Sequence, residues 1–339
     1  MKRVALSPVA AVLATSLLSL TLPTQSAWAC ASCGCNLSAD WDNPGLLGDT
    51  GFKLDVRYDY LNQNQLRSGT GTISSFAASQ IVHGDEPQEV EKYTRNNYLT
   101  VAMDYTVNRD WGVNLQLPYV VRNHSTLGTA SDGATPGADG GQYDSRTASL
   151  GDVKLIGRYM GLLPARNLAL LFGLKLATGS HTETGTSTDP NNPGPVDIDR
   201  GLQPGTGTTD LILGATYVGS LTPTVNYMLQ GLFQSALRAS DGYRPGNGVN
   251  LNAGLRYTAW SSAQPQLQLN IRHALRDMGE NADQVSTGGT LVYLSPGVNV
   301  PLNRQAAFYG YIQVPLYQDV NGVQLAPKYT ASVGVRYAF

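Results

Sequence analysis

Beyond its first 30 residues, this chain of 339 residues has no long hydrophobic run. No later stretch approaches the roughly 18 consecutive apolar residues that a membrane-spanning helix needs, and this absence excludes a helical membrane protein. Charge is also scarce: charged residues make up 14% of the chain, and the formal net charge is -2. Without an excess of positive charge, nothing favours a nucleic acid as a partner.

Motifs for catalysis are missing as well. Three of the four histidines, His83, His124 and His181, lie in segments predicted to be loops, and His273 lies near the end of a predicted strand. No histidine–serine pairing resembles that of the barrel phospholipases, and no acidic pair resembles that of the barrel proteases. Solvated or interfacial histidines are therefore favoured over catalytic ones, and the sequence predicts a protein that is not an enzyme.

The N-terminus has the pattern of a secretory signal peptide. Lys2 and Arg3 precede an apolar stretch at about 9–22, and Ala27-Trp28-Ala29 fits an A-x-A cleavage site. The apolar stretch is too short for a spanning helix, so cleavage after Ala29 is expected. Lipidation of the new first residue, Cys30, is the minority alternative, because a small alanine stands three places before it.

The remainder of the chain alternates between apolar and polar residues, most clearly at 51–62. There Phe52, Leu54 and Val56 alternate with Lys53 and Asp55, which places apolar groups on one face of a strand and charges on the other. A soluble sandwich would turn the apolar face inward, whereas a membrane barrel inverts the pattern. Periodicity alone leaves both open.

Segment and connection lengths favour the membrane barrel. Many of the runs reach the roughly 9 to 11 residues that a tilted strand needs to cross a bilayer. Twelve runs are predicted, at 51–62, 92–107, 111–123, 149–162, 167–179, 208–219, 224–238, 247–260, 265–277, 288–301, 305–317 and 327–339. Their connections alternate strictly between short and long, as in outer-membrane barrels with short periplasmic turns and long extracellular loops. The short ones lie at 108–110, 164–166, 220–224, 261–263 and 302–304, and the long ones at 63–91, 124–148, 180–207, 239–246, 278–287 and 318–326.

The sequence therefore predicts an all-β, antiparallel, up-and-down transmembrane barrel of about 12 strands in the outer membrane of a Gram-negative bacterium. The expected parts are a signal peptide at 1–29, a periplasmic segment at 30–50 and the barrel at 51–339. The last run ends in Phe339, and a final alternating strand with a terminal aromatic residue resembles the signal read by the outer-membrane assembly machinery. That machinery and the lipids of the outer membrane are the expected partners.

Several strand-and-turn segments resemble the outer-membrane barrels of the meta-pathway phenol-degradation type, a family of transporters. The segments that carry the resemblance are Trp111-Gly-Val-Asn-Leu-Gln-Leu-Pro-Tyr119, Leu150-Gly-Asp-Val153, Gly173-Leu-Lys-Leu-Ala-Thr-Gly179, Gly205-Thr-Gly-Thr-Thr-Asp210, Tyr243-Arg-Pro-Gly246 and Tyr293-Leu-Ser-Pro-Gly297. Ala177 departs from the pattern, since the family has a proline there. The resemblance implies a transporter barrel and leaves its substrate open.

Polar residues on alternating positions are predicted to line the lumen. They are Lys53, Asp55, Arg57, Asp59, Asp152, Lys154, Arg158, Asn250, Asn252, Arg256, Gln266, Gln268, Asn270, Arg272, Thr330, Ser332 and Arg336. Both signs of charge are present, which fits a hydrated pore with tuned selectivity and, alternatively, a salt-bridged interior that is closed. A passive channel or uptake barrel for small molecules is the favoured function.

One motif is not needed for a barrel. Cys30, Cys33 and Cys35 crowd the predicted mature N-terminus, and the chain has no other cysteine. No cofactor is expected for the barrel itself, but three close thiols could bind a soft metal such as Cu(I) or exchange disulfides with a periplasmic redox or metal protein. The alternative function is therefore a membrane anchor for this motif, and a simple local disulfide is an equally open reading.

Overall fold

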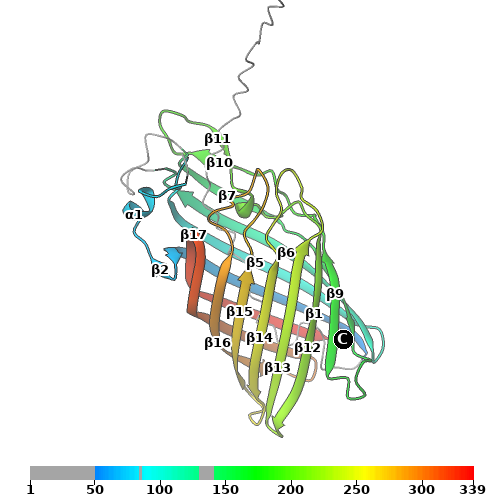
Figure 1. The fold of residues 1–339 in the computed structure, drawn as a ribbon. Helices are drawn as coiled ribbons and strands as arrows, with labels where there is room; N and C mark the ends of the chain where they lie inside the picture. Colours follow the sequence, from blue (N-terminus) through cyan, green and yellow to red (C-terminus); the bar gives the residue numbers. More distant parts are fainter. Residues whose placement is uncertain (1–49, 84–85, 130–140) are drawn as a thin grey trace, which may run out of the picture.

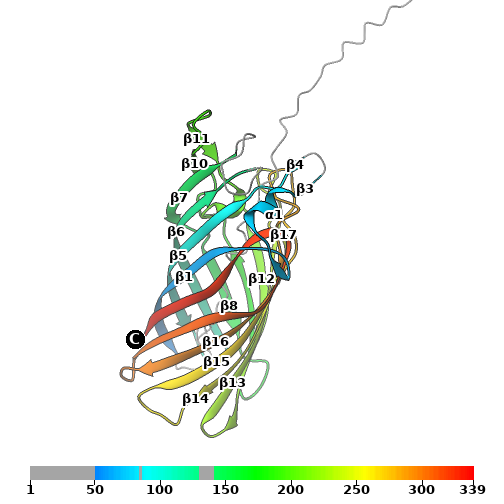
Figure 2. The same cartoon turned by 90° about the vertical axis from the view of Figure 1, so that its left-hand side faces the viewer.

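A computed structural model describes residues 50–83, 86–129 and 141–339 and shows a closed antiparallel β-barrel (Figures 1 and 2). Within these residues, eleven strands form the ring, and pairing of β17 with β1 and of β6 with β8 completes it. The strands are β1 Gly51–Gly69, β5 Glu91–Thr106, β6 Trp111–Thr126, β8 Lys154–Tyr159, β9 Leu168–Lys175, β12 Asp210–Thr222, β13 Val225–Ala236, β14 Gly248–Tyr257, β15 Gln264–Ala274, β16 Gly289–Pro301 and β17 Ala306–Ala338. The prediction of an all-β antiparallel barrel is confirmed.

The connections differ strongly between the two ends of the barrel. The upper end in Figure 1, here the long-loop end, carries additional short elements, whereas tight turns join the strands at the opposite, short-turn end. The additional elements are β2 Gly71–Thr72, α1 Ser75–Ser79, β3 Val82–His83, β4 Glu86–Pro87, β7 Tyr143–Leu150, β10 Thr184–Ser187, β11 Pro195–Asp197 and the 3-10 helix η2 Arg200–Leu202. Among the described residues, no helix is both long and apolar enough to cross a membrane.

The two faces of the strands are inverted relative to a soluble protein. On β1, Phe52, Val56 and Tyr58 are exposed, whereas Asp55 and Asp59 on the opposite face are buried. Aromatic side chains gather at the short-turn end, where Trp111 packs on Tyr159 with ring centroids 4.7 Å apart. An apolar outer band with an aromatic rim around a polar interior is the surface pattern of a barrel in a bilayer.

The C-terminal region differs from its prediction, which was two strands separated by a loop at 318–326. In the structure this region is the single strand β17. It is one element that stays extended throughout and doubles back near Gly322, which has a positive φ of 58°. Near its ends, Ala338 N donates to Gln305 O over 2.8 Å, so the two arms lie side by side. The predicted loop is therefore strand, because both arms keep their neighbours: β16 pairs with the first arm and β1 with the second.

The predicted strand at 149–162 is also different, because it is interrupted. β6 pairs with β7 from Tyr119 upward and with β8 from Gln116 downward. Pro118 stands where the partner changes, and its carbonyl accepts a hydrogen bond from Gly151 N over 2.8 Å. A proline lacks an N–H for a sheet, so a break in the neighbouring strand is a favourable place for it.

Candidate functional site

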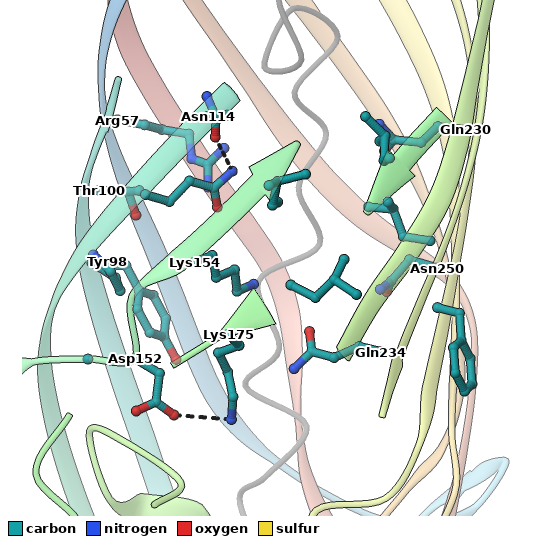
Figure 3. Close-up of a pocket in the computed structure, with 18 of the residues that line it drawn as sticks. Arg57, Tyr98, Thr100, Asn114, Asp152, Lys154, Lys175, Gln230, Gln234 and Asn250 are labelled. Carbon is teal, nitrogen blue, oxygen red and sulfur yellow. Dashed lines mark hydrogen bonds and ion pairs between the residues drawn. The ribbon is translucent and has the colours of Figure 1, made fainter. Parts of the chain in front are cut away.

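A cavity of about 320 Å³ lies inside the barrel, and Figure 3 shows the side chains that surround it. Its lining comes from β1, β5, β6, β8, β9, β12, β13 and β14 and from the segments between β7 and β8 and before β12. Of the predicted lumen residues, six line the cavity: Arg57, Asp152, Lys154, Arg158, Asn250 and Asn252. The sheet therefore brings residues that are far apart in sequence to one chamber.

Four cations contribute to the polar lining of this chamber. Arg57, Lys154, Arg158 and Lys175 line it together with a single carboxylate, Asp152. The guanidinium groups are held by carboxylates: Arg57 Nε lies 2.9 Å from Asp59, and Arg158 Nη1 lies 2.8 Å from Asp104. Because these pairs are buried, they form a fixed charged wall that presents nitrogen atoms to the chamber.

The interruption between β7 and β8 builds one corner of the chamber, here called the Asp152 junction. The Asp152 carboxylate accepts hydrogen bonds from Gly179 N over 3.0 Å and from Thr206 N over 2.9 Å. Lys175 Nζ lies 3.1 Å from Asp152 and 3.0 Å from Asp210 and so bridges the two acids. These residues belong to three of the segments that carry the family resemblance, which meet here in space.

Close backbone approach makes glycine necessary at this junction. A Cβ on Gly179 would lie 2.7 Å from the Cα of Gly205, and a Cβ on Gly205 would lie 2.6 Å from the carbonyl carbon of Gly179. Any side chain would separate the two segments and pull Thr206 away from Asp152. The two glycines thus allow the carboxylate to be satisfied by backbone N–H groups.

Apolar side chains line the chamber beside the cations, which the sequence analysis does not predict. They are Ile156, Leu171, Ile212 and Leu232. Ile156 lies between Lys154 and Arg158 on β8, and Leu171 pairs directly with Arg158. Leu171 also belongs to a buried cluster with Met160, Ala169, Val218 and Met228. The signal in the sequence is that β9 reads Leu-Ala-Leu-Leu-Phe-Gly-Leu-Lys, apolar on both faces, where a strand facing a hydrated lumen should alternate.

A ladder of amides occupies the adjoining wall. Asn270 Nδ2 donates to Asn252 Oδ1 over 2.8 Å, and Asn252 Nδ2 donates to Gln230 Oε1 over 2.9 Å. Gln230 Nε2 then donates to Thr216 Oγ1 over 3.0 Å. Each step crosses to the next strand, so the ladder fixes the orientation of neutral polar groups around the lumen.

The remaining predicted lumen residues lie outside the chamber lining. Asp55 accepts a hydrogen bond from Tyr309 Oη over 2.8 Å and lies 3.4 Å from Arg336, and Arg256 Nη2 donates to Gln266 over 3.2 Å. Arg272 Nη1 donates to Asn250 over 3.1 Å, and Lys53 is half-buried. Much of the polar interior is thus engaged with itself, which narrows the open part of the lumen to the chamber.

A packed apolar cluster, here called the cap, lies at the long-loop end. Val90, Leu127, Val323 and Leu325 belong to one buried apolar cluster, and His124 lies beside it. The prediction of a solvated His124 in a loop is wrong, because β6 continues through this residue. Burial lowers the pKa of His124 to about 3, so the imidazole stays neutral and its Nδ1 pairs with Thr94 Oγ1 at 2.8 Å.

Asp283 ties the loop before β16 into this cap. Its carboxylate accepts hydrogen bonds from Val285 N and Ser286 N, both at 2.7 Å. Ser286 Oγ then donates to Gln88 over 3.2 Å and accepts from Val323 N over 3.2 Å. Burial raises the pKa of Asp283 to about 6, against the attraction of the turn N–H groups.

The raised pKa of Asp283 makes the stability of the fold depend on pH, and replacement of Asp283 by asparagine should remove this dependence. The folded state holds the Asp283 proton up to about pH 6 and the unfolded state only to about 3.8, so this group stabilises the fold below pH 3.8. That contribution, about 3 kcal/mol for two pKa units, is lost as the pH rises to 6. We expect Asp283→Asn, which keeps the acceptor oxygen, to remove it. The check is the difference in unfolding free energy between wild type and variant at pH 4 and pH 7, and equal slopes would contradict the assignment.

Metal and redox sites are not part of this geometry. Among the described residues, no group of three or more His, Cys, Asp or Glu side chains is arranged to hold a metal ion. Cys30, Cys33 and Cys35 lie outside the described residues, so the hypothesis of a soft metal or disulfide exchange there stays a prediction.

Comparison with known proteins identifies the fold. No protein-family profile matches the chain, and no curated protein matches its sequence. Among solved structures, the COG4313 outer membrane channel from Pseudomonas putida F1 is similar with a TM-score of 0.58 at 13% identity, covering 86% of this chain and 97% of that one. The β domain of the Bordetella autotransporter BrkA reaches 0.47 at 15% identity, with 86% and 100% covered. The CymD monoaromatic hydrocarbon channel reaches 0.46 at 10% identity, with 92% and 98% covered.

Proposed function

We propose that this protein is an outer-membrane channel of a Gram-negative cell that admits small organic molecules with an apolar body and a polar or acidic group. The observation that carries the proposal is the chamber, which combines the cationic side chains Arg57, Arg158 and Lys175 with the adjoining apolar side chains Leu171 and Ile212. A solute with an apolar and an acidic part can contact both kinds of side chain at once, whereas a sugar leaves the apolar side chains unmatched. The similar fold of a known outer membrane channel supports the transport class.

The proposal includes a topology. The signal peptide at 1–29 is removed, the short-turn end faces the periplasm and the long-loop end faces the outside, in keeping with outer-membrane barrels. The ring of the described residues has eleven strands, and counting the two arms of β17 separately supports an even number, which would return both ends of the barrel to the same side. Phe339, the proposed assembly signal, packs on Phe52 with ring centroids 5.3 Å apart.

Flux measurements test the proposed function. The mature chain, purified and placed in liposomes, should pass benzoate faster than arabinose, although the two solutes are similar in size. In planar bilayers it should conduct ions in discrete steps, because the chamber is hydrated on its cationic side. Liposomes that admit neither solute faster than protein-free vesicles would refute the channel, and equal rates for both would refute the selectivity expected from the mixed polar and apolar lining.

The cationic wall should also set the ion selectivity. Lys154 lines the chamber and is half-buried, so Lys154→Glu places a negative charge where ions pass. We expect the permeability ratio of chloride to potassium to fall about fivefold or more, since two unit charges a few ångströms apart interact by about 1 kcal/mol even in water. Lys92→Glu, the same change at an exposed position outside the chamber lining, is the control, and reversal potentials in a salt gradient give the ratio. An equal effect of both variants would mean that Lys154 does not face the permeation path.

A further inference from the structure

Basic side chains form a row across the outside of the barrel on one wall. The register pairs Asn62 of β1 with Arg95 of β5, Arg95 with Asn123 of β6, and Asn123 with Arg146 of β7. Lys328 of β17 lies next to this set, where the register between β1 and β17 is irregular between the pairs Leu61–Thr330 and Gln63–Pro327. Directly paired residues of antiparallel strands point to the same side, so Asn62, Arg95, Asn123 and Arg146 lie side by side. Together with Lys328 these residues are here called the basic row, and Arg95, Arg146 and Lys328 are exposed.

The row lies at one edge of the apolar outer band. Residues 96–105 of β5 and 52–61 of β1 lie between the row and the short-turn end, and each stretch provides the roughly 9 to 11 residues that cross a bilayer. Tyr329 of β17 is exposed beside Lys328. An aromatic residue at this depth is typical of the interface, so the row stands at the level of the lipid headgroups.

The opposite wall has no such row. At the long-loop end, Val249 pairs with His273, His273 with Thr290, and Thr290 with Asp319. In this second outward-facing set, among the described residues, no lysine or arginine occurs, and Asp319 is acidic. At this level of the strands, the basic residues therefore lie on the wall formed by β17, β1, β5, β6 and β7.

The cations of the row lack acidic partners within the described residues. Arg95 lies over the ring of Tyr93, 4.6 Å from its centroid, and none of Arg95, Arg146 and Lys328 forms a salt bridge there. Asp144, two residues above Arg146 on the same face, is the nearest acid along the strand. Guanidinium groups at this level prefer phosphate, which they bind with two parallel hydrogen bonds.

We propose that the basic row binds the phosphate groups of an anionic, phosphorylated lipid in the outward-facing leaflet. Arg95 and Arg146 lie two strands apart, about 10 Å at the usual strand spacing, so a headgroup with two separated phosphates can contact both. Tyr329, beside Lys328, packs on its acyl and sugar parts, and the asparagines between the cations supply additional donors. This inference rests on the proposed placement in an outer membrane.

Binding of a purified diphosphorylated lipid A to the detergent-solubilised barrel tests the proposal. Each cation lost should weaken the affinity about fivefold, so Arg95→Gln with Arg146→Gln should weaken it about 25-fold, and adding Lys328→Gln should exceed 100-fold. The matched control is Arg109→Gln with Arg304→Gln, two exposed arginines at the short-turn end. The affinity of the wild type should fall with added salt and with removal of the lipid phosphates, and millimolar inorganic phosphate should not compete.

The proposal would be overturned if the double variant of Arg95 and Arg146 bound the lipid with the same affinity as the control double variant. It would also be overturned if removal of the lipid phosphates left the affinity of the wild type unchanged. All substituted residues are exposed, so folding should be normal, and the single variants Arg95→Gln and Arg146→Gln serve if the combined one is poorly folded. Conductance separates the two proposals: a channel that conducts without binding the lipid refutes only the basic row. A barrel that binds the lipid and passes no solute refutes only the proposed function.

Discussion

Replacement of Arg158 by leucine is expected to destabilise the barrel by about 3–5 kcal/mol, the usual effect of removing one partner from a buried ion pair. Arg158 is 2% exposed, its Nη1 lies 2.8 Å from Asp104, and its Nη2 donates to Thr106 over 3.0 Å. Without the guanidinium, the Asp104 carboxylate stays inside the barrel wall with too few donors. Unfolding in urea in the presence of detergent or lipid gives the free energy.

Two further variants distinguish the buried charge from lost packing. Arg166→Leu also breaks an arginine–aspartate pair, but Arg166 and Asp110 are 42% and 38% exposed, so the change should cost less than about 1 kcal/mol. Arg158→Leu combined with Asp104→Leu should recover much of the loss, because no uncompensated charge remains. If Arg158→Leu and Arg166→Leu cost the same, the interior is hydrated enough to screen the pair.

Arginine at the middle of the apolar band is the second substitution expected to have a large effect. Val333 is exposed on the outer face of β17 opposite Tyr58 of β1, and Val333→Arg should destabilise the inserted barrel by about 2–4 kcal/mol. Tyr329→Arg, at the edge of the band on the same strand, should cost only about 0–1 kcal/mol. Unfolding from lipid vesicles measures both.

The comparison needs a control at the edge of the band rather than in the lumen. Ser332 was the natural lumen position from the sequence, but its hydroxyl donates to Asp59 and its side chain is buried. An arginine there would disturb packing and charge together. Equal costs for Val333→Arg and Tyr329→Arg would contradict a membrane around this wall, since the penalty depends on depth.

The strands were predictable because each is specified locally. Alternation of apolar and polar residues along 51–62 defines a strand and its two faces, and short polar turns such as 108–110 locate the hairpins. The prediction went wrong where neighbouring strands decide the conformation. Residues 318–326 look like a loop in isolation, but pairing with β16 and β1 keeps them extended.

The chamber could be predicted only in part, for a related reason. Alternation identifies Arg57 and Arg158 as inward-facing, but their partners depend on the register between strands, which no local pattern contains. Lys175 was missed because β9 is apolar on both faces and gives no inward face. The Asp152 junction requires three segments to meet, and a single sequence shows each only as a turn.

The seam between β1 and β17 also bears on how the chain folds. It pairs Lys53 with Ala338 and Leu54 with Tyr337, residues at opposite ends of the described barrel, whereas most other neighbours in the ring are joined by local hairpins. Loop-closure entropy makes such distant pairing slow, and hairpins form much faster. The sheet should therefore form one hairpin at a time, and the pairing of β1 with β17 should form last. Until that moment two bare edges are exposed, and a chain stalled there is open to pairing with a second copy.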